Sequence, residues 1–177
     1  MTVTDAAPRP VELDFARDFY ERFAEAWNSH QQEAVLAMMT EDIVYEDSAW
    51  PRPMRGHAEV REFLDSTWRA LPDLRFEFVD DLILLHPSRP LAASYWRGYG
   101  TNTGPIDPPG FAPTGKRIEF EGMDLHEYRD GKLCRLWIVF DMTDVSRQLG
   151  ILPPVGSRGE RALTVLQQIQ ARISRRR

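Results

Sequence analysis

The stretch KRIEFEGMDLHEYRDGKLCRLWIVFD, residues 116–141, decides the fold class of this chain. Apolar and polar side chains alternate through most of it, which is the period of a β-strand. The dipeptide Asp130-Gly131 interrupts the alternation and is typical of a two-residue hairpin turn. The stretch therefore predicts two antiparallel strands, residues 116–128 and 133–141, joined by a tight turn.

Outside this hairpin, the apolar spacing divides the chain into a mainly helical first part and a stranded second part. The expected elements, in chain order, are a helix at 11–28, a short helix opened by a capping box of Ser29 and Gln32, a strand at 43–47, a helix at 56–71, strands at 74–78 and 91–101, a loop at 101–115, the hairpin, a short helix at 144–149 and a last helix at 157–174. This order predicts an α+β fold: a curved antiparallel sheet, covered by helices on its concave side, that forms a cone around an apolar pocket.

Length and composition fit one globular domain of 177 residues with short appendages. We expect a loose lead-in at 1–10, the cone at 11–152, and a helix with a basic tail at 153–177. Segment 157–177 carries six arginines against Glu160, which favours a solvated C-terminal helix. A net charge of −5 argues against a nucleic-acid partner, and no apolar run approaches the ~20 residues that span a bilayer.

The cysteine and histidine patterns point to a cytoplasmic protein without a metal site. Cys134 is the single cysteine and cannot form an intrachain disulfide, and no basic stretch followed by an apolar core begins the sequence. The four histidines lack metal-ligand spacing, and no glycine-rich phosphate loop follows a strand. We therefore expect neither a metal nor a cofactor.

Strand alternation indicates which polar side chains face the pocket. Asp124 and His126 share a face with Phe120, and Asp47 shares a face of its own strand with Tyr45. Burial in an apolar pocket raises the pKa of a carboxyl group, which can then act as a base near neutral pH or as a protonated donor. Two such groups suit removal of a proton next to a carbonyl: one takes the proton and the other hydrogen-bonds the developing enolate oxygen.

The same residues also have purely structural interpretations. Asp47 could be a turn residue that ends a strand, and Asp124 with His126 could be a hydrogen-bonded structural pair. Tyr95 and Arg97 share one strand face, which fits packing and ion pairing as well as substrate contact.

Several short motifs, taken in order, resemble those of SnoaL-like polyketide cyclases in the nuclear-transport-factor-2-like superfamily. The stretches that carry the resemblance are TEDIVYED at 40–47, MRGHAE at 54–59, PTGKRIEF at 113–120, GMDLH at 122–126, RDGKL at 129–133, Asp141 and RQLG at 147–150. The resemblance covers about residues 14–152 and rests on the order and spacing of these motifs. It implies a cone-shaped domain, a homodimer and a cofactor-free activity.

Ketosteroid isomerases belong to the same superfamily and combine a general-base aspartate with a protonated aspartate that binds the oxyanion. The resemblance implies that Asp47 corresponds to the base and Asp124 to the oxyanion partner. The first-helix tyrosine of those enzymes would fall near Phe23, so Tyr20 is the candidate substitute.

SnoaL-like cyclases place a histidine in the penultimate strand, which His126 matches, and an acidic aspartate in the last strand, where this chain has Ile138. The related limonene-epoxide-hydrolase type needs an Asp-Arg-Asp set. Arg97 matches its arginine, but Tyr99 and Ile138 replace both aspartates. The sequence therefore does not favour epoxide hydrolysis.

Our first hypothesis is a cyclase or isomerase that acts on an apolar, polycyclic or polyketide-like carbonyl compound. Asp47, Asp124 and His126 are its expected catalytic residues. The expected substrate-binding residues are Tyr20, Phe23, Trp27, Tyr45, Trp50, Phe63, Tyr95, Arg97, Phe120, Ile138 and Phe140.

Two other functions stay open. The same cone could be a non-catalytic module that binds a small apolar molecule. Alternatively, the outer sheet face, with Trp96, Trp137 and Val139, could pack on a second copy as a scaffold. The helix at 157–174 could serve as a lid or as a dimer contact.

Overall fold

A computed structural model of the chain describes residues 9–175. In chain order the elements are α1 (Leu13–Asn28), α2 (Gln32–Ala37), β1 (Met39–Asp47), β2 (Met54–Arg55), α3 (Gly56–Ala70), β3 (Arg75–Leu85), β4 (Leu91–Thr101), β5 (Arg117–Arg129), β6 (Lys132–Phe140), α4 (Met142–Leu149) and α5 (Arg158–Ser174). Residues 1–8 of the expected lead-in, and Arg176 and Arg177 of the basic tail, lie outside the described part.

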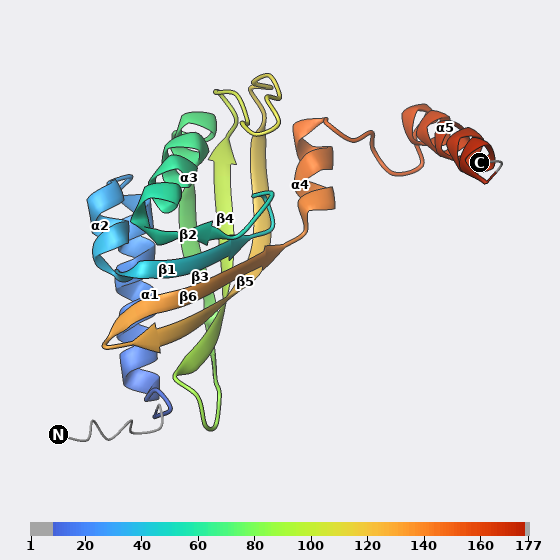
Figure 1. Cartoon of the computed structure of the whole chain (residues 1–177). Helices are drawn as coiled ribbons and strands as arrows, with labels where there is room; N and C mark the ends of the chain where they lie inside the picture. The colour runs from blue at the N-terminus through green and yellow to red at the C-terminus, as the bar shows by residue number, and fades with distance from the viewer. Residues whose placement is uncertain (1–8, 176–177) are drawn as a thin grey trace.

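The strands form one curved sheet in the order β2-β1-β6-β5-β4-β3 (Figure 1). The expected hairpin is present as β5 and β6, with Asp124 opposite Ile138. One pair departs from the expected antiparallel pattern, because β1 runs parallel to β6. These two strands are far apart in the sequence, so no tight turn imposes an antiparallel direction on them.

Helices α1 and α3 pack on the concave side of the sheet, as the apolar spacing predicts. Their inward residues recur every three or four positions, which places them on one helix face. In α1 this face buries Phe19, Phe23 and Trp27, and in α3 it buries Val60 and Phe63. The α+β cone is therefore confirmed, with the aromatic side chains of α1 at its centre.

The expected capping box at the start of α2 is wrong. The Ser29 hydroxyl donates to the carbonyl oxygen of Ala26 at 2.7 Å and accepts from the Gln31 amide at 3.2 Å. His30 has a positive φ of 55°, so the chain turns before α2 begins at Gln32. Ser29 consequently closes the end of α1 instead of opening α2.

The last helix is present as α5, and it stands away from the cone on the side opposite α1, α2 and α3 (Figure 1). Ser157 caps its start by accepting a hydrogen bond from the Glu160 amide at 3.1 Å. Among residues 9–175, no helix has the length and apolar content needed to cross a membrane.

Candidate active site

The cone encloses a cavity of about 240 Å³ between α1, α3 and the concave face of the sheet. Segment 106–111 and α4 complete its lining. Most of the expected substrate-binding residues line this cavity: Phe23, Trp27, Tyr45, Trp50, Phe63, Phe120, Ile138 and Phe140. Asp47 and Asp124 line it as well. A mostly apolar wall with a few polar groups is typical of a small-molecule site.

The two carboxylates belong to one row of residues that crosses the concave face. Asp47 on β1 lies beside Ile138 on β6. Ile138 lies opposite Asp124 on β5, and Asp124 lies opposite Ser94 on β4. Neighbouring strands are about 4.8 Å apart, so the backbones of the two aspartates are separated by about 10 Å. Ile138 therefore sits directly between the two carboxylates.

Asp47 ends β1 and is both a turn residue and a cavity residue. Its Oδ1 accepts a hydrogen bond from the Ala49 amide at 2.8 Å. Burial among apolar side chains raises the pKa of Asp47 to about 7, and the Ala49 hydrogen bond opposes this rise only in part. Near neutral pH, Asp47 can therefore exist with or without its proton, which is the property of a general base.

Asp124 is held by a chain of buried hydrogen bonds along β5. Its Oδ2 lies 2.9 Å from Nε2 of His126, and Nδ1 of His126 lies 3.3 Å from the hydroxyl oxygen of Tyr128. Burial raises the pKa of Tyr128 well above its usual value, so this hydroxyl keeps its proton. Tyr128 can then donate to Nδ1, which leaves the ring proton on Nε2, directed at Asp124.

His126, an expected catalytic residue, does not line the cavity. His126 is fully buried and lies behind Asp124, outside the lining of the cavity. The rings of Phe19, Tyr20 and Phe23 surround it, with Tyr20 stacked on it at 4.3 Å between ring centroids. Aromatic side chains of α1 fill this end of the cone, so His126 can act only through Asp124.

Tyr20 does not line the cavity, contrary to the expectation that it binds substrate, and lies beside His126. Burial, followed by the charge of Asp124, raises the pKa of its hydroxyl far above the usual value. Within residues 9–175, three buried polar atoms in this region have no hydrogen-bond partner: the Tyr20 hydroxyl, the Ser94 hydroxyl and Oδ1 of Asp124. Such unpaired groups are rare in folded proteins. Of the three residues, only Asp124 lines the cavity.

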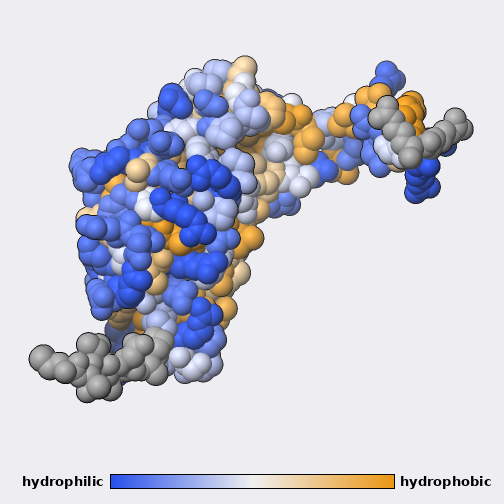
Figure 2. Space-filling model, in the orientation of Figure 1, coloured by the Kyte–Doolittle hydropathy of each residue, from blue (hydrophilic) through white to orange (hydrophobic). Residues whose placement is uncertain are grey.

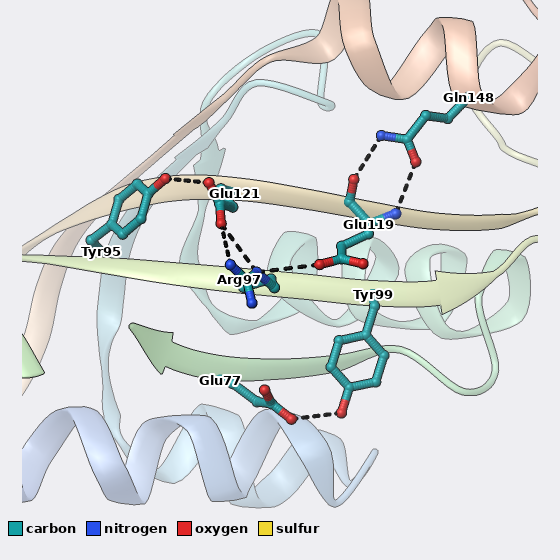
Figure 3. A network of polar contacts seen from close by, with 7 residues as sticks. All are labelled: Glu77, Tyr95, Arg97, Tyr99, Glu119, Glu121 and Gln148. Carbon is teal, nitrogen blue, oxygen red and sulfur yellow. Dashed lines mark hydrogen bonds and ion pairs between the residues drawn. The ribbon is translucent and has the colours of Figure 1, made fainter. Parts of the chain in front are cut away.

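Tyr95 and Arg97, which were also expected to bind substrate, do not line the cavity either. Both point to the convex face of the sheet, where Glu121 binds them, at 2.5 Å from the Tyr95 hydroxyl and 2.7 Å from Nη2 of Arg97 (Figure 3). The Tyr99 hydroxyl on the same face donates to Glu77 at 2.8 Å. Because side chains alternate along a strand, the odd-numbered residues of β4 point to this face and the even-numbered ones point into the cone.

Trp96 lies inside the cone, 5% exposed, as part of the cavity wall, and not on the outer face where the scaffold hypothesis puts it. It faces Gly122 across the β4–β5 pair, and glycine leaves room for its ring. Phe76 and Phe78 on β3 also line the cavity and are not among the expected site residues. The alternation of Phe76 and Phe78 with charged neighbours is the signal that could have identified them.

Among the described residues, no group of three or more His, Cys, Asp or Glu side chains could hold a metal ion.

The SnoaL-like polyketide cyclase family matches residues 17–149 of this sequence. The chain belongs to this family. Membership supports a cyclase- or isomerase-type function and agrees with the cavity and its carboxylates. No curated protein shows significant similarity to the chain.

Solved structures share the fold of this SnoaL-like chain. AclR from Streptomyces galilaeus is 21% identical, with a TM-score of 0.68, over 93% of this chain and 98% of that chain. IdmH from Streptomyces antibioticus is 24% identical, with a TM-score of 0.60, over 75% and 96%. A protein from Catenulispora acidiphila with a ketosteroid isomerase-like fold, in complex with trimethylamine, is 14% identical, with a TM-score of 0.62, over 75% and 92%.

Proposed function

We propose that the protein is a cofactor-free cyclase or isomerase that removes a proton next to a carbonyl group of an apolar, polycyclic or polyketide-like substrate. The observation that carries this proposal is the row in which Asp47 and Asp124 flank Ile138 at the wall of one apolar cavity. A cavity of about 150 Å³ holds benzene. The volume of about 240 Å³ therefore suits a compound of roughly two fused rings.

Asp47 is the general base in this proposal. Its pKa of about 7 keeps a useful fraction ionised at neutral pH and still makes the carboxylate basic enough to take a carbon-bound proton. The apolar walls exclude water from the reacting atoms, which strengthens each electrostatic contact inside the cavity.

Asp124 is the partner of the developing enolate oxygen. Oδ2 accepts from Nε2 of His126, whereas Oδ1 makes no hydrogen bond among the described residues. Oδ1 is therefore the atom that is free to hydrogen-bond the enolate oxygen. His126 is a positioning residue, since it fixes the Asp124 carboxyl group without reaching the cavity.

Exchange of carbon-bound hydrogen for deuterium tests the reaction without knowledge of the natural substrate. Enolisable bicyclic ketones such as 2-tetralone are incubated with the protein in D₂O, and loss of the α-proton signal is followed by NMR. We expect exchange that is faster than in buffer and that falls about 10²–10⁴-fold in Asp47→Asn. The matched control is Glu46→Gln, because Glu46 faces away from the cavity and pairs with Arg135 at 2.8 Å. Unchanged exchange in Asp47→Asn would contradict the assignment.

The second candidate function is a non-catalytic module that binds an apolar small molecule. Ile138 favours it, because an apolar side chain stands on the cavity wall where related cyclases have an aspartate. A ligand that binds the cavity tightly and is recovered unaltered, with no catalysed exchange in any ketone, would support this alternative over catalysis.

We also propose that two copies associate through the convex face of the sheet. Two adjacent cross-strand rows of mainly apolar residues, here called the convex apolar band, comprise Leu84, Ala93, Leu125 and Trp137, and then Tyr95, Met123 and Val139. Leu84 is 54% and Val139 is 53% exposed. Uncovered apolar surface of this kind is typical of a protein–protein contact.

A further inference from the structure

Helix α5 presents an apolar stripe that nothing else in residues 9–175 buries. None of its 17 residues is buried. Its large apolar side chains are 47–57% exposed and comprise Leu163, Val165, Leu166, Ile169 and Ile173. Figure 2 shows the helix as a separate lobe with orange patches beside blue ones. Most of the stability of a helix in a protein comes from packing of its apolar face, so a partner surface would stabilise α5.

Charge is distributed asymmetrically around this stripe. The stripe advances by alternating steps of four and three residues through Ala162, Leu166, Ile169 and Ile173. With 100° of rotation per residue, Arg161, Arg172 and Arg175 fall together on one flank of it. Gln167 lies on the other flank. The helix therefore offers an apolar stripe with one basic border.

The convex face of the sheet offers the complementary pattern. Next to the convex apolar band, a shallow groove is lined by four exposed carboxylates, Glu119, Glu121, Asp141 and Asp144, together with Phe120 and Gln148. Arg97 offsets part of this charge through its ion pairs with Glu119 and Glu121, at 3.3 and 2.7 Å. The four carboxylates still outnumber this one arginine, so the groove keeps a negative charge. An apolar band with an acidic border thus matches an apolar stripe with a basic border.

We propose that α5 docks on the convex face of a second copy of this chain, and that the α5 helix of the second copy docks in the same way on the first. In this exchange α5 is the arm of each copy. The inference rests on the proposed association through that face and names the element that covers it. An exchange of identical arms closes under two-fold symmetry, so it produces a dimer and no open polymer.

A second copy fits better than the other partners of an amphipathic helix. Direct pairing of two α5 helices would bring their arginine flanks together without compensating carboxylates. A membrane-binding helix usually carries basic residues across its whole polar side, whereas here the arginines gather toward one flank and the rest of that side bears Thr164, Gln167 and Ser174. The helix also projects away from its own cone, on the side opposite α1, α2 and α3 (Figure 1).

Cross-linking between two differently tagged chains tests the exchange. Cys134→Ser is the background in both, with Val139→Cys in one chain and Ile169→Cys in the other, and a short bismaleimide joins the thiols. We expect a cross-linked heterodimer. The control replaces Ile169→Cys with Gln167→Cys, on a different side of α5, and should link at least tenfold less. A link that forms only when both cysteines are in one chain, in a product of monomer mass, would show that α5 folds onto its own cone and would overturn the exchange.

Sedimentation of full-length variants separates this inference from the association on which it rests. We expect a dimer, with a dissociation constant raised at least tenfold by Ile169→Asp and by Val139→Asp, and unchanged by Gln167→Asp. If only Val139→Asp weakens the dimer, the convex face is the interface and the role of α5 is overturned. If the wild type is a monomer at micromolar concentration, both ideas are overturned. A monomer that co-sediments through α5 with phosphatidylserine vesicles would assign the helix to membranes instead.

Discussion

The burial that makes Asp47 a candidate base also makes its charge unfavourable for folding. The pKa of Asp47 rises from 3.8 to about 7 in the folded protein. Between these pH values the unfolded chain has lost the proton while the folded protein keeps it. The free energy of unfolding therefore falls as pH rises from about 4 to about 7, and stays lower above that.

Replacement of Asp47 by asparagine should therefore stabilise the protein at neutral and alkaline pH. The asparagine side chain keeps an oxygen that can accept from the Ala49 amide, and it carries no charge. Because the carboxyl group is only partly shielded from water, we expect a gain of about 1–2 kcal/mol at pH 8. The gain should shrink toward zero near pH 4. Chemical denaturation at both pH values measures it, with Glu46→Gln as the control, and a loss of stability at pH 8 would contradict this expectation.

His126 should matter for folding as well as for positioning. His126→Leu removes the partner of Asp124 Oδ2 and leaves a carboxyl group buried without it. We expect the free energy of unfolding to fall by about 2 kcal/mol, because a buried polar group loses its partner. The double variant Asp124→Leu, His126→Leu should recover part of the loss, since that unpaired carboxyl group is then absent. Denaturation curves of the three proteins test this, and equal losses in the single and double variants would argue against a coupled pair.

At the scale of elements, close contact between β4 and β5 shapes the cavity wall. A Cβ atom at Gly122 would lie 2.6 Å from the Trp96 ring and 2.6 Å from the carbonyl oxygen of Val139. Glycine at this position leaves room for the indole, which forms part of the cavity wall.

Gly122→Ala should therefore destabilise the protein by about 1–3 kcal/mol, which is the usual effect of overpacking. In a Trp96→Phe background the same change should cost less, because the ring contact is relieved while the contact with Val139 stays. Thermal or urea unfolding of the four proteins measures the difference. Additive losses would show that the indole is not the obstacle.

The elements with a clear period were predictable from the sequence. The alternation of residues 116–141 and the aromatic spacing of α1 gave the hairpin, the helix and the concave face correctly. The parallel pairing of β1 with β6 was not predictable, because it depends on contacts between segments far apart in the chain.

The site could be predicted in part for the same reason. The alternation of side chains along β5 was enough to place Asp124 on the cavity wall. The same alternation in β4, where even-numbered residues face the cone, could have placed Trp96 there. Alternation could not distinguish Asp124 from His126, because both side chains face inward. Only the packing of α1 side chains around His126 keeps it out of the cavity lining. Tyr95 and Arg97 were expected to contact substrate because their side chains are polar. Their odd-numbered positions in β4 instead place them on the convex face.

At the scale of the whole molecule, charge is divided between the cone and the C-terminal segment. Residues 153–177 carry six arginines and one glutamate in a chain of net charge −5, so the rest of the chain is strongly acidic. This division favours contact between the C-terminal segment of one copy and the cone of another.

The proposed dimer should therefore weaken with salt. Raising the ionic strength from 0.05 to about 0.5 M screens the arginine–carboxylate contacts at the border of the apolar band. We expect the dissociation constant to rise several-fold in the wild type. The variant Arg161→Gln, Arg172→Gln should already be weaker at low salt and should depend less on it. Analytical ultracentrifugation at the two salt concentrations gives both values, and salt independence would mean that charge plays no part.

The proposed reaction depends most on a cavity carboxyl group that can take a proton near neutral pH. The direct measurement is a ¹³C NMR titration of the Asp47 carboxyl carbon in the free protein, assigned by comparison with Asp47→Asn. We predict that it titrates near pH 7, as burial among apolar side chains requires. Titration near the ordinary value of 3.8 would mean that Asp47 is solvated, and it would contradict the assignment of this residue as the base.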